Sequence, residues 1–119
     1  MKQKRHDDVL EKAVEAYLVK EVKKLGGMSL KWPAIAQKGV PDRICIFPGI
    51  GVKFIEVKRT HGTTTQLQDA MMAKIVVAGG DCAVVKGKDG VDGLIERVKE
   101  LIKQSEAGVY EPQQLSDLL

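Results

Sequence analysis

Two short apolar runs separated by a turn limit the possible folds of this chain more than any other feature. Residues 42–47 read Asp-Arg-Ile-Cys-Ile-Phe, and residues 52–58 read Val-Lys-Phe-Ile-Glu-Val-Lys. Both runs are rich in the β-branched and aromatic residues that favour strands. The intervening Pro-Gly-Ile-Gly at 48–51 is a turn signal. We therefore expect an antiparallel hairpin.

Helical and strand-like patterns flank this hairpin on both sides. The sequence predicts helices over 7–25, 66–78 and 91–104, further strands over 28–32 and 82–85, and a turn over 86–90. On the second helix, the predicted inner face consists of Leu67, Ala70, Met71, Ile75 and Ala78. The order α-β-β-β-α-β-α predicts an α/β fold. Its last strand should run parallel to a hairpin strand, which gives a mixed β-sheet flanked by helices.

The length of 119 residues fits one domain. We place this domain at residues 1–104 and expect residues 105–119 to form a tail or an interface arm. No apolar run is long enough to span a membrane, and the first residues lack the apolar stretch of a secretory signal. We therefore expect a protein that is not secreted, in which Cys45 and Cys82 are reduced core thiols.

The formal net charge of +3 is unevenly distributed along the chain. Residues 1–58 contain 12 basic and 7 acidic side chains, whereas residues 59–119 contain 7 and 9. A basic half suits a polyanionic partner such as a nucleic acid. The same imbalance is also common on an ordinary solvated surface.

Three ionisable side chains gather at one end of the predicted hairpin. Glu56 and Lys58 are two residues apart, so they point to the same face of a strand. Asp42 opens the neighbouring strand. Carboxylates are suitable ligands for Mg²⁺ or Mn²⁺, and such an ion can activate water for attack on a phosphate. Taken alone, however, Glu56 and Lys58 would be read as a solvated pair on an exposed strand.

The wider sequence resembles the PD-(D/E)xK nuclease superfamily and, within it, the VRR-NUC type, the virus-type replication and repair nucleases. The matching features are Gly-Val-Pro-Asp-Arg at 39–43, the hairpin with its Pro-Gly turn, Glu-Val-Lys-Arg at 56–59, Thr65-Gln66, and Ala-Gly-Gly-Asp-Cys-Ala-Val-Val at 78–85. They span roughly residues 15–85. A PD…ExK pattern alone arises often by chance, whereas this ordered set is specific. The resemblance implies a restriction-endonuclease-like fold in a single VRR-NUC domain.

The resemblance also implies a set of metal ligands. Asp42 and Glu56 would bind Mg²⁺ or Mn²⁺, with the backbone carbonyl of Val57 as a further ligand. Members of the family carry another glutamate on the first helix. We assign this ligand to Glu15, and Glu11, one turn earlier, is the alternative.

Further roles follow from the same resemblance. Asp42, Glu56, Lys58 and Gln66 would be the catalytic set. Lys58 would be the catalytic lysine, and Gln66 would support Lys58 or the attacking water. The expected substrate contacts are Lys38, Arg43, Arg59 and His61.

The implied activity is metal-dependent hydrolysis of DNA by an endonuclease. We expect a homodimer that selects branched DNA, similar to Holliday-junction resolvases, because two sites related by a two-fold axis suit a two-fold substrate. No membrane and no small-molecule cofactor are expected, and the family suggests the cytoplasm of a bacterial or phage-infected cell. The alternatives are a nucleic-acid-binding module without catalysis and a restriction-type endonuclease with sequence specificity.

Overall fold

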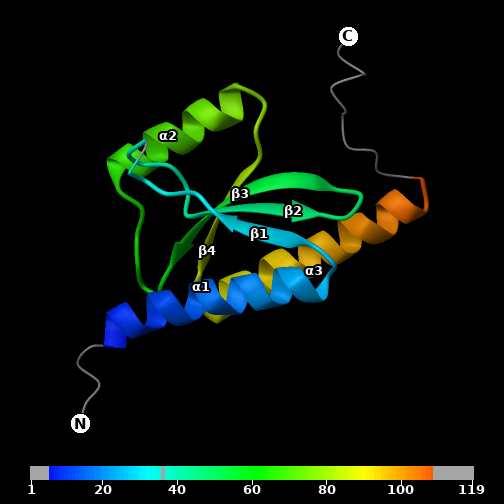
Figure 1. Ribbon diagram of the computed structural model, residues 1–119, viewed down its shortest axis with the longest axis horizontal. Coiled ribbons are helices and arrows are strands. Elements are labelled where there is room, and N and C mark those ends of the chain that lie inside the picture. Colours follow the sequence, from blue (N-terminus) through cyan, green and yellow to red (C-terminus); the bar gives the residue numbers. More distant parts are fainter. Residues whose placement is uncertain (1–5, 36, 109–119) are drawn as a thin grey trace.

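The computed structural model describes residues 6–35 and 37–108, which form a four-stranded sheet and three helices (Figure 1). The elements are α1 (His6–Lys24), β1 (Met28–Lys31), β2 (Arg43–Phe47), β3 (Gly51–Lys58), α2 (Gln66–Val77), β4 (Cys82–Lys86) and α3 (Gly87–Glu106). Their order confirms the prediction from the sequence.

The sheet is mixed, with strand order β1-β2-β3-β4. β2 and β3 form the expected antiparallel hairpin, and β1 pairs antiparallel with the other side of β2. β4 runs parallel to β3, which places Val84 in register with Glu56. β4 therefore follows the predicted parallel arrangement and lies at one edge of the sheet.

The hydrophobic core lies on one face of this sheet. Alternate strand residues such as Cys45, Ile55 and Val85 point to that face and are buried. α1 and α3 lie side by side across it (Figure 1). The helices contribute Val14, Leu18 and Val22 from α1, and Val91, Ile95 and Val98 from α3. The spacing of three or four residues puts each set on one helix face, so the two helices cover the core.

The predicted turn at 86–90 is wrong, because α3 already begins at Gly87. Two glycines in this segment suggested a turn, but the structure uses them for close packing. A Cβ atom on Gly90 would approach the backbone carbonyl carbon of Val85 to 3.2 Å. A Cβ atom on Gly87 would meet the Thr60 hydroxyl at 2.5 Å. Because the glycines permit these contacts, the first helical turn packs directly on β4 and on the segment after β3.

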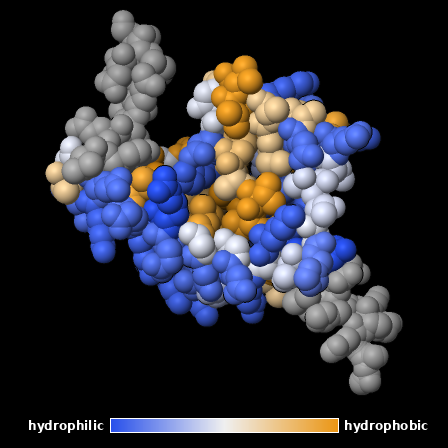
Figure 2. All heavy atoms as spheres, turned by 180° about the vertical axis from the view of Figure 1, so that it is seen from behind, coloured by the Kyte–Doolittle hydropathy of each residue, from blue (hydrophilic) through white to orange (hydrophobic). Residues whose placement is uncertain are grey.

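α2 lies on the opposite face of the sheet and buries little of its surface. Met72 is its buried residue, whereas Leu67, Ala70 and Ala78 of the predicted inner face are exposed. The prediction of this face was therefore partly wrong. Figure 2 shows apolar surface gathered around a hollow on the side of the molecule turned away in Figure 1.

The C-terminal arm predicted at 105–119 overlaps α3 at its start. Ser105 belongs to this helix, and its hydroxyl donates a hydrogen bond of 3.3 Å to the carbonyl of Gly49 in the hairpin turn. Residues 109–119 lie outside the described residues. Of the two cysteines, Cys45 is buried, Cys82 is half-buried, and both are free thiols. No helix within 6–35 and 37–108 is long and apolar enough to cross a membrane.

Candidate active site

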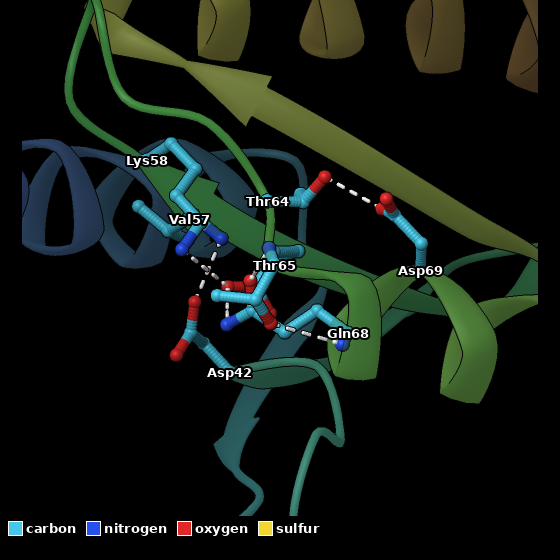
Figure 3. A network of polar contacts seen from close by, with 8 residues as sticks. Asp42, Val57, Lys58, Thr64, Thr65, Gln68 and Asp69 are labelled. Atoms are coloured by element: carbon cyan, nitrogen blue, oxygen red, sulfur yellow. Dashed lines mark hydrogen bonds and ion pairs between the residues drawn. The ribbon is translucent and has the colours of Figure 1, made fainter.

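Two hydrogen bonds, one to its backbone and one to its side chain, hold Asp42 at the end of the hairpin. Its carbonyl accepts a 3.0 Å hydrogen bond from the N–H of Trp32, which extends the pairing of β1 with β2. Its carboxylate Oδ2 accepts a 2.7 Å hydrogen bond from the N–H of Val57 (Figure 3). Asp42 is thus fixed beside the last residues of β3.

Gly39 allows the segment before Asp42 to approach α2 closely. Its φ of +83° lies in the left-handed region that favours glycine. A Cβ atom at this position would lie only 2.9 Å from Cγ and 3.0 Å from the carbonyl oxygen of Leu67. Sterics therefore explain the glycine of the Gly-Val-Pro-Asp-Arg sequence. Because it has no side chain, the segment that carries Asp42 can pack against the start of α2.

Glu56 is a buried carboxylate, with only 2% of its surface exposed. Its Oε2 accepts a 3.0 Å hydrogen bond from Nε2 of Gln68 and lies 3.4 Å from Nζ of Lys58. Its Oε1 is buried and has no hydrogen-bond partner within the part of the chain that the structure describes. Buried polar atoms are nearly always paired, so this oxygen is the unusual atom of the site.

The surroundings of Glu56 favour its neutral form in the absence of a cation. Burial and the negative charge of Asp42 raise the pKa of Glu56 to about 7, although Lys58 acts in the opposite direction. Two neighbouring carboxylates that cannot both ionise easily form a site that a cation would stabilise.

Lys58 brings a positive charge to this carboxylate pair. It ends β3 on the same face as Glu56, as the strand period predicts, and its side chain is 13% exposed. In Figure 3 its amino group points toward the carboxylates. Lys86 is in register with Lys58 on the parallel strand β4, so a second, exposed lysine lies beside it.

Gln68, which the sequence analysis did not select, connects α2 to the carboxylates. Besides its bond to Glu56, its Oε1 accepts a 2.9 Å hydrogen bond from the N–H of Thr65. The Thr65 hydroxyl accepts a 3.1 Å hydrogen bond from the N–H of Gln68, which completes a capping box. The Thr-x-x-Gln pattern at 65–68 was the signal that could have identified this residue. Gln66, the predicted glutamine, is exposed.

Glu15 lies near the site but is already bound to cations. Its Oε2 accepts a 2.8 Å hydrogen bond from Nε of Arg43 and lies 3.7 Å from Nζ of Lys31. Arg43 points to the α1 side of the sheet, whereas Asp42 and Glu56 belong to the other face. The structure therefore brings Glu15 to Arg43 and not to the carboxylate pair.

The residues present fit a divalent cation in part. Oε1 of Glu56 is a buried, unpaired carboxylate oxygen beside a second carboxylate, and hard cations bind such oxygens. Within residues 6–35 and 37–108, no group of three or more acidic, histidine or cysteine side chains gathers around a common point. The fit thus rests on Asp42 and Glu56.

The predicted substrate contacts differ in their placement. Lys38 and His61 are exposed, and Arg43 is bound to Glu15. Arg59 follows Lys58 in a tight turn, in which its carbonyl accepts a 2.9 Å hydrogen bond from the N–H of Gly62.

Comparisons with known proteins indicate the class of protein to which this chain belongs. No profile of a known protein family matches the sequence. The chain is 31% identical over 81 residues to "Putative nuclease p44" of Acyrthosiphon pisum secondary endosymbiont phage 1. The matched residues cover 68% of this chain and 87% of that protein. A solved structure described as a VRR_NUC domain superposes with a TM-score of 0.64 at 27% identity, covering 72% of this chain and 94% of that one.

The mixed sheet with flanking helices, the nuclease relative and the similar solved structure define a nuclease of the PD-(D/E)xK-like fold. More specifically, the chain belongs to the VRR-NUC family of nucleases.

Proposed function

We propose that this nuclease hydrolyses phosphodiester bonds of DNA as an endonuclease that depends on Mg²⁺ or Mn²⁺. The observation that carries the proposal is the buried, unpaired Oε1 of Glu56 beside Asp42. Leaving such an atom without a partner costs on the order of 1–3 kcal/mol, and a bound cation would remove that cost. Asp42 and Glu56 would hold the ion, with the carbonyl of Val57 as a further ligand.

The bound cation would polarise the scissile phosphate and lower the pKa of a water molecule. Lys58 would donate hydrogen bonds to the attacking water or to the phosphate oxygens, which gain negative charge in the transition state. Gln68 would act as a positioning residue, because its amide fixes one oxygen of Glu56 and leaves the other for the ion. Arg43 and Arg59 would contact the DNA backbone on either side of this set.

For the third carboxylate, the ion pairs of Glu15 lead us to propose Glu11 in place of our first choice. α1 is followed by β1, whose Met28 pairs with Ile46 at the far end of β2. The N-terminal half of α1 therefore lies toward the Asp42 end of the sheet. Glu11 is one helical turn, about 5.4 Å, closer to that end than Glu15. Glu15 would then serve to hold Arg43.

We further propose branched DNA as the substrate and a homodimer as the active form. Two sites related by a two-fold axis would suit a four-way junction. The basic first half of the chain supports binding to a polyanion. The phage relative supports a setting in a bacterial cell.

The test is cleavage of labelled DNA with Mg²⁺, Mn²⁺ or EDTA. The substrates are a four-way junction, a flap, a linear duplex and a single strand. We expect paired cuts in the junction with either metal and none with EDTA. Lys58→Ala should reduce the rate at least about 100-fold, whereas Lys99→Ala, an exposed lysine on α3, should cleave normally.

Other outcomes would assign a different function. Metal-independent binding without cleavage of any substrate would identify a nucleic-acid-binding module. Discrete fragments from long linear duplex would identify a restriction-type endonuclease. Cleavage of the flap alone would preserve the nuclease but reject the two-fold substrate.

A further inference from the structure

Lys86, the last residue of β4, lies beside the lysine of the candidate active site. β4 runs parallel to β3, and the pairing places Lys86 next to Lys58 just as it places Val84 next to Glu56. Side chains alternate along a strand and Val85 points into the core, so Lys86 lies on the same sheet face as the carboxylates. Neighbouring strands are about 4.8 Å apart. Two adjacent lysines therefore lie at this end of the sheet.

The two lysines differ in their partners. Nζ of Lys58 lies 3.4 Å from Oε2 of Glu56, and only 13% of the lysine side chain is exposed. Lys86 is exposed, and its side chain forms neither an ion pair nor a hydrogen bond with any residue that the structure describes. Lys88, the next lysine along the chain, lies over the ring of Tyr17, with Nζ 5.5 Å from the ring centre. Lys86 thus carries a positive charge that no described side chain balances.

Lysine is a poor residue for the position that Lys86 occupies in the chain. Lys86 is the N-cap of α3 and has the extended backbone of a cap, with φ −111° and ψ 117°, yet its side chain makes no capping hydrogen bond. Ser, Thr, Asp and Asn stabilise this position, and the dipole of a helix disfavours a cation at its N-terminus. Natural proteins break such local rules mainly at functional sites. The lysine therefore needs an explanation other than the stability of α3.

The backbone of Lys86 is held on both sides. Its pairing with β3 fixes one side. On the other side, a Cβ atom on Gly87 would lie only 2.5 Å from the Thr60 hydroxyl, so the chain after Lys86 packs directly on the segment after Lys58. The two lysines therefore keep their relative position, and only their side chains can move. Such a pair can contact two phosphates of one DNA strand, since contacts to phosphates fix the position of the duplex without reading its sequence.

We propose that Lys86 binds the phosphate next to the scissile one in the cleaved DNA strand. This inference rests on the proposed function, in which the cation and Lys58 act on the scissile phosphate. The cleaved strand would then cross the end of the sheet from β3 toward β4. On the other side of β3, Arg43 and Lys31 share the carboxylate of Glu15, so their charges are partly balanced. The unbalanced cation on β4 attracts a polyanion more strongly, and this difference directs the strand.

The test is the substitution Lys86→Ser, which removes the cation and supplies a capping hydroxyl. Fluorescence anisotropy of a labelled four-way junction in EDTA measures binding without cleavage over a range of salt concentrations. We expect a dissociation constant about 10-fold higher than that of the parent, and a salt dependence reduced by about 0.9 in log K against log salt, the value for one phosphate contact. Lys86→Arg keeps the charge and should bind as the parent does. The melting temperature of Lys86→Ser should rise by roughly 2–6 °C, because serine caps α3.

Cleavage of the same junction with Mn²⁺ separates binding from chemistry. Lys86→Ser should raise KM about 10-fold and leave kcat within about 2-fold, whereas Lys58→Ala should lower kcat. Lys103→Ala is the matched control, since it removes the same charge from an exposed position on α3. Lys103 lies two residues before Ser105, whose hydroxyl contacts the hairpin turn at the opposite end of the sheet. The control should bind and cleave as the parent does.

Each result supports or overturns the inference. Weaker binding and a smaller salt dependence in Lys86→Ser, with a normal control, would support it. Parent-like binding would overturn it and leave Lys86 as a solvated lysine of an edge strand. Equal weakening by Lys103→Ala would overturn it too, because net charge alone would then explain binding. A parent protein that binds the junction but cleaves no DNA, with weaker binding by Lys86→Ser, would reject the nuclease and retain Lys86 as a phosphate contact. A parent protein that binds no DNA would overturn both.

Discussion

Nε2 of Gln68, in the first turn of α2, donates a 3.0 Å hydrogen bond to Oε2 of the buried Glu56 in β3. The same side chain closes the capping box that begins α2. One residue thus joins the start of a helix to the carboxylate that we assign to the metal ion. Because the helix cap is part of the site, disturbing either should affect the other.

The first prediction compares the two glutamines of this helix. Gln68→Ala should reduce the cleavage rate about 10- to 100-fold, because Glu56 loses the donor that orients it. It should also weaken Mn²⁺ binding measured by calorimetry. Gln66→Ala, two residues away and exposed, should behave as the parent. Equal effects of the two substitutions would reject the positioning role of Gln68.

The second prediction concerns the dependence of stability on pH without metal. The pKa of Glu56 is about 7 in the folded protein, against an ordinary value of 4.5. The folded state therefore binds more protons between these values, and stability should fall as the pH rises from about 4.5 to 7. Well above pH 7 the ionised Glu56 should cost about 3 kcal/mol.

The matched variant for this measurement is Glu56→Gln, which keeps the shape but cannot ionise. Denaturant unfolding should show it about 3 kcal/mol more stable than the parent at pH 8 and nearly equal to it at pH 4. Identical pH profiles for the two proteins would show that Glu56 does not titrate as the structure indicates.

The third prediction is that divalent cations stabilise the fold. Adding Mg²⁺ or Mn²⁺ at 100 times its dissociation constant should raise the free energy of unfolding by about 2.7 kcal/mol. At one fixed metal concentration, the gain should be larger at pH 8 than at pH 5, because protons compete for Glu56. Asp42→Asn should lose the effect in a thermal melt. A melting temperature that does not change with Mg²⁺ or Mn²⁺, or that rises only with Ca²⁺, would contradict the proposed site.

The fourth prediction separates the two glutamates of α1. Glu11→Gln should weaken Mn²⁺ binding about 10-fold or more. Glu15→Gln should leave metal affinity nearly unchanged but strengthen DNA binding and steepen its salt dependence, because it removes a negative charge and frees Arg43 from its 2.8 Å bond to contact phosphate. If Glu15→Gln loses metal and Glu11→Gln does not, the original assignment of Glu15 is correct and the ion pair with Arg43 must open when metal binds.

Local patterns predicted the order of the elements well, because apolar periodicity and turn residues act over a few neighbouring positions. They failed where packing between segments distant in the chain decides to which element or face a residue belongs. Gly87 and Gly90 read as a turn, yet both belong to α3, where β4 and Thr60 approach them too closely for side chains. On α2, a polar residue, Gln68, faces inward because a buried carboxylate on β3 needs a donor.

By itself, the sequence determined the hairpin, the mixed sheet, and the set Asp42, Glu56 and Lys58 at one end of that sheet. The hairpin and the sheet follow from apolar runs and turn residues, and the period of a strand puts Glu56 and Lys58 on the same face. The resemblance to PD-(D/E)xK nucleases implied that these two residues and Asp42 form one set. Only the tertiary structure decided that Glu56 is buried with one unpaired oxygen, that Gln68 contacts it, that Glu15 is bound to Arg43, and that one sheet face stays exposed. Each depends on contacts between residues distant in the chain, and free energies of burial and pairing arise only when such residues meet.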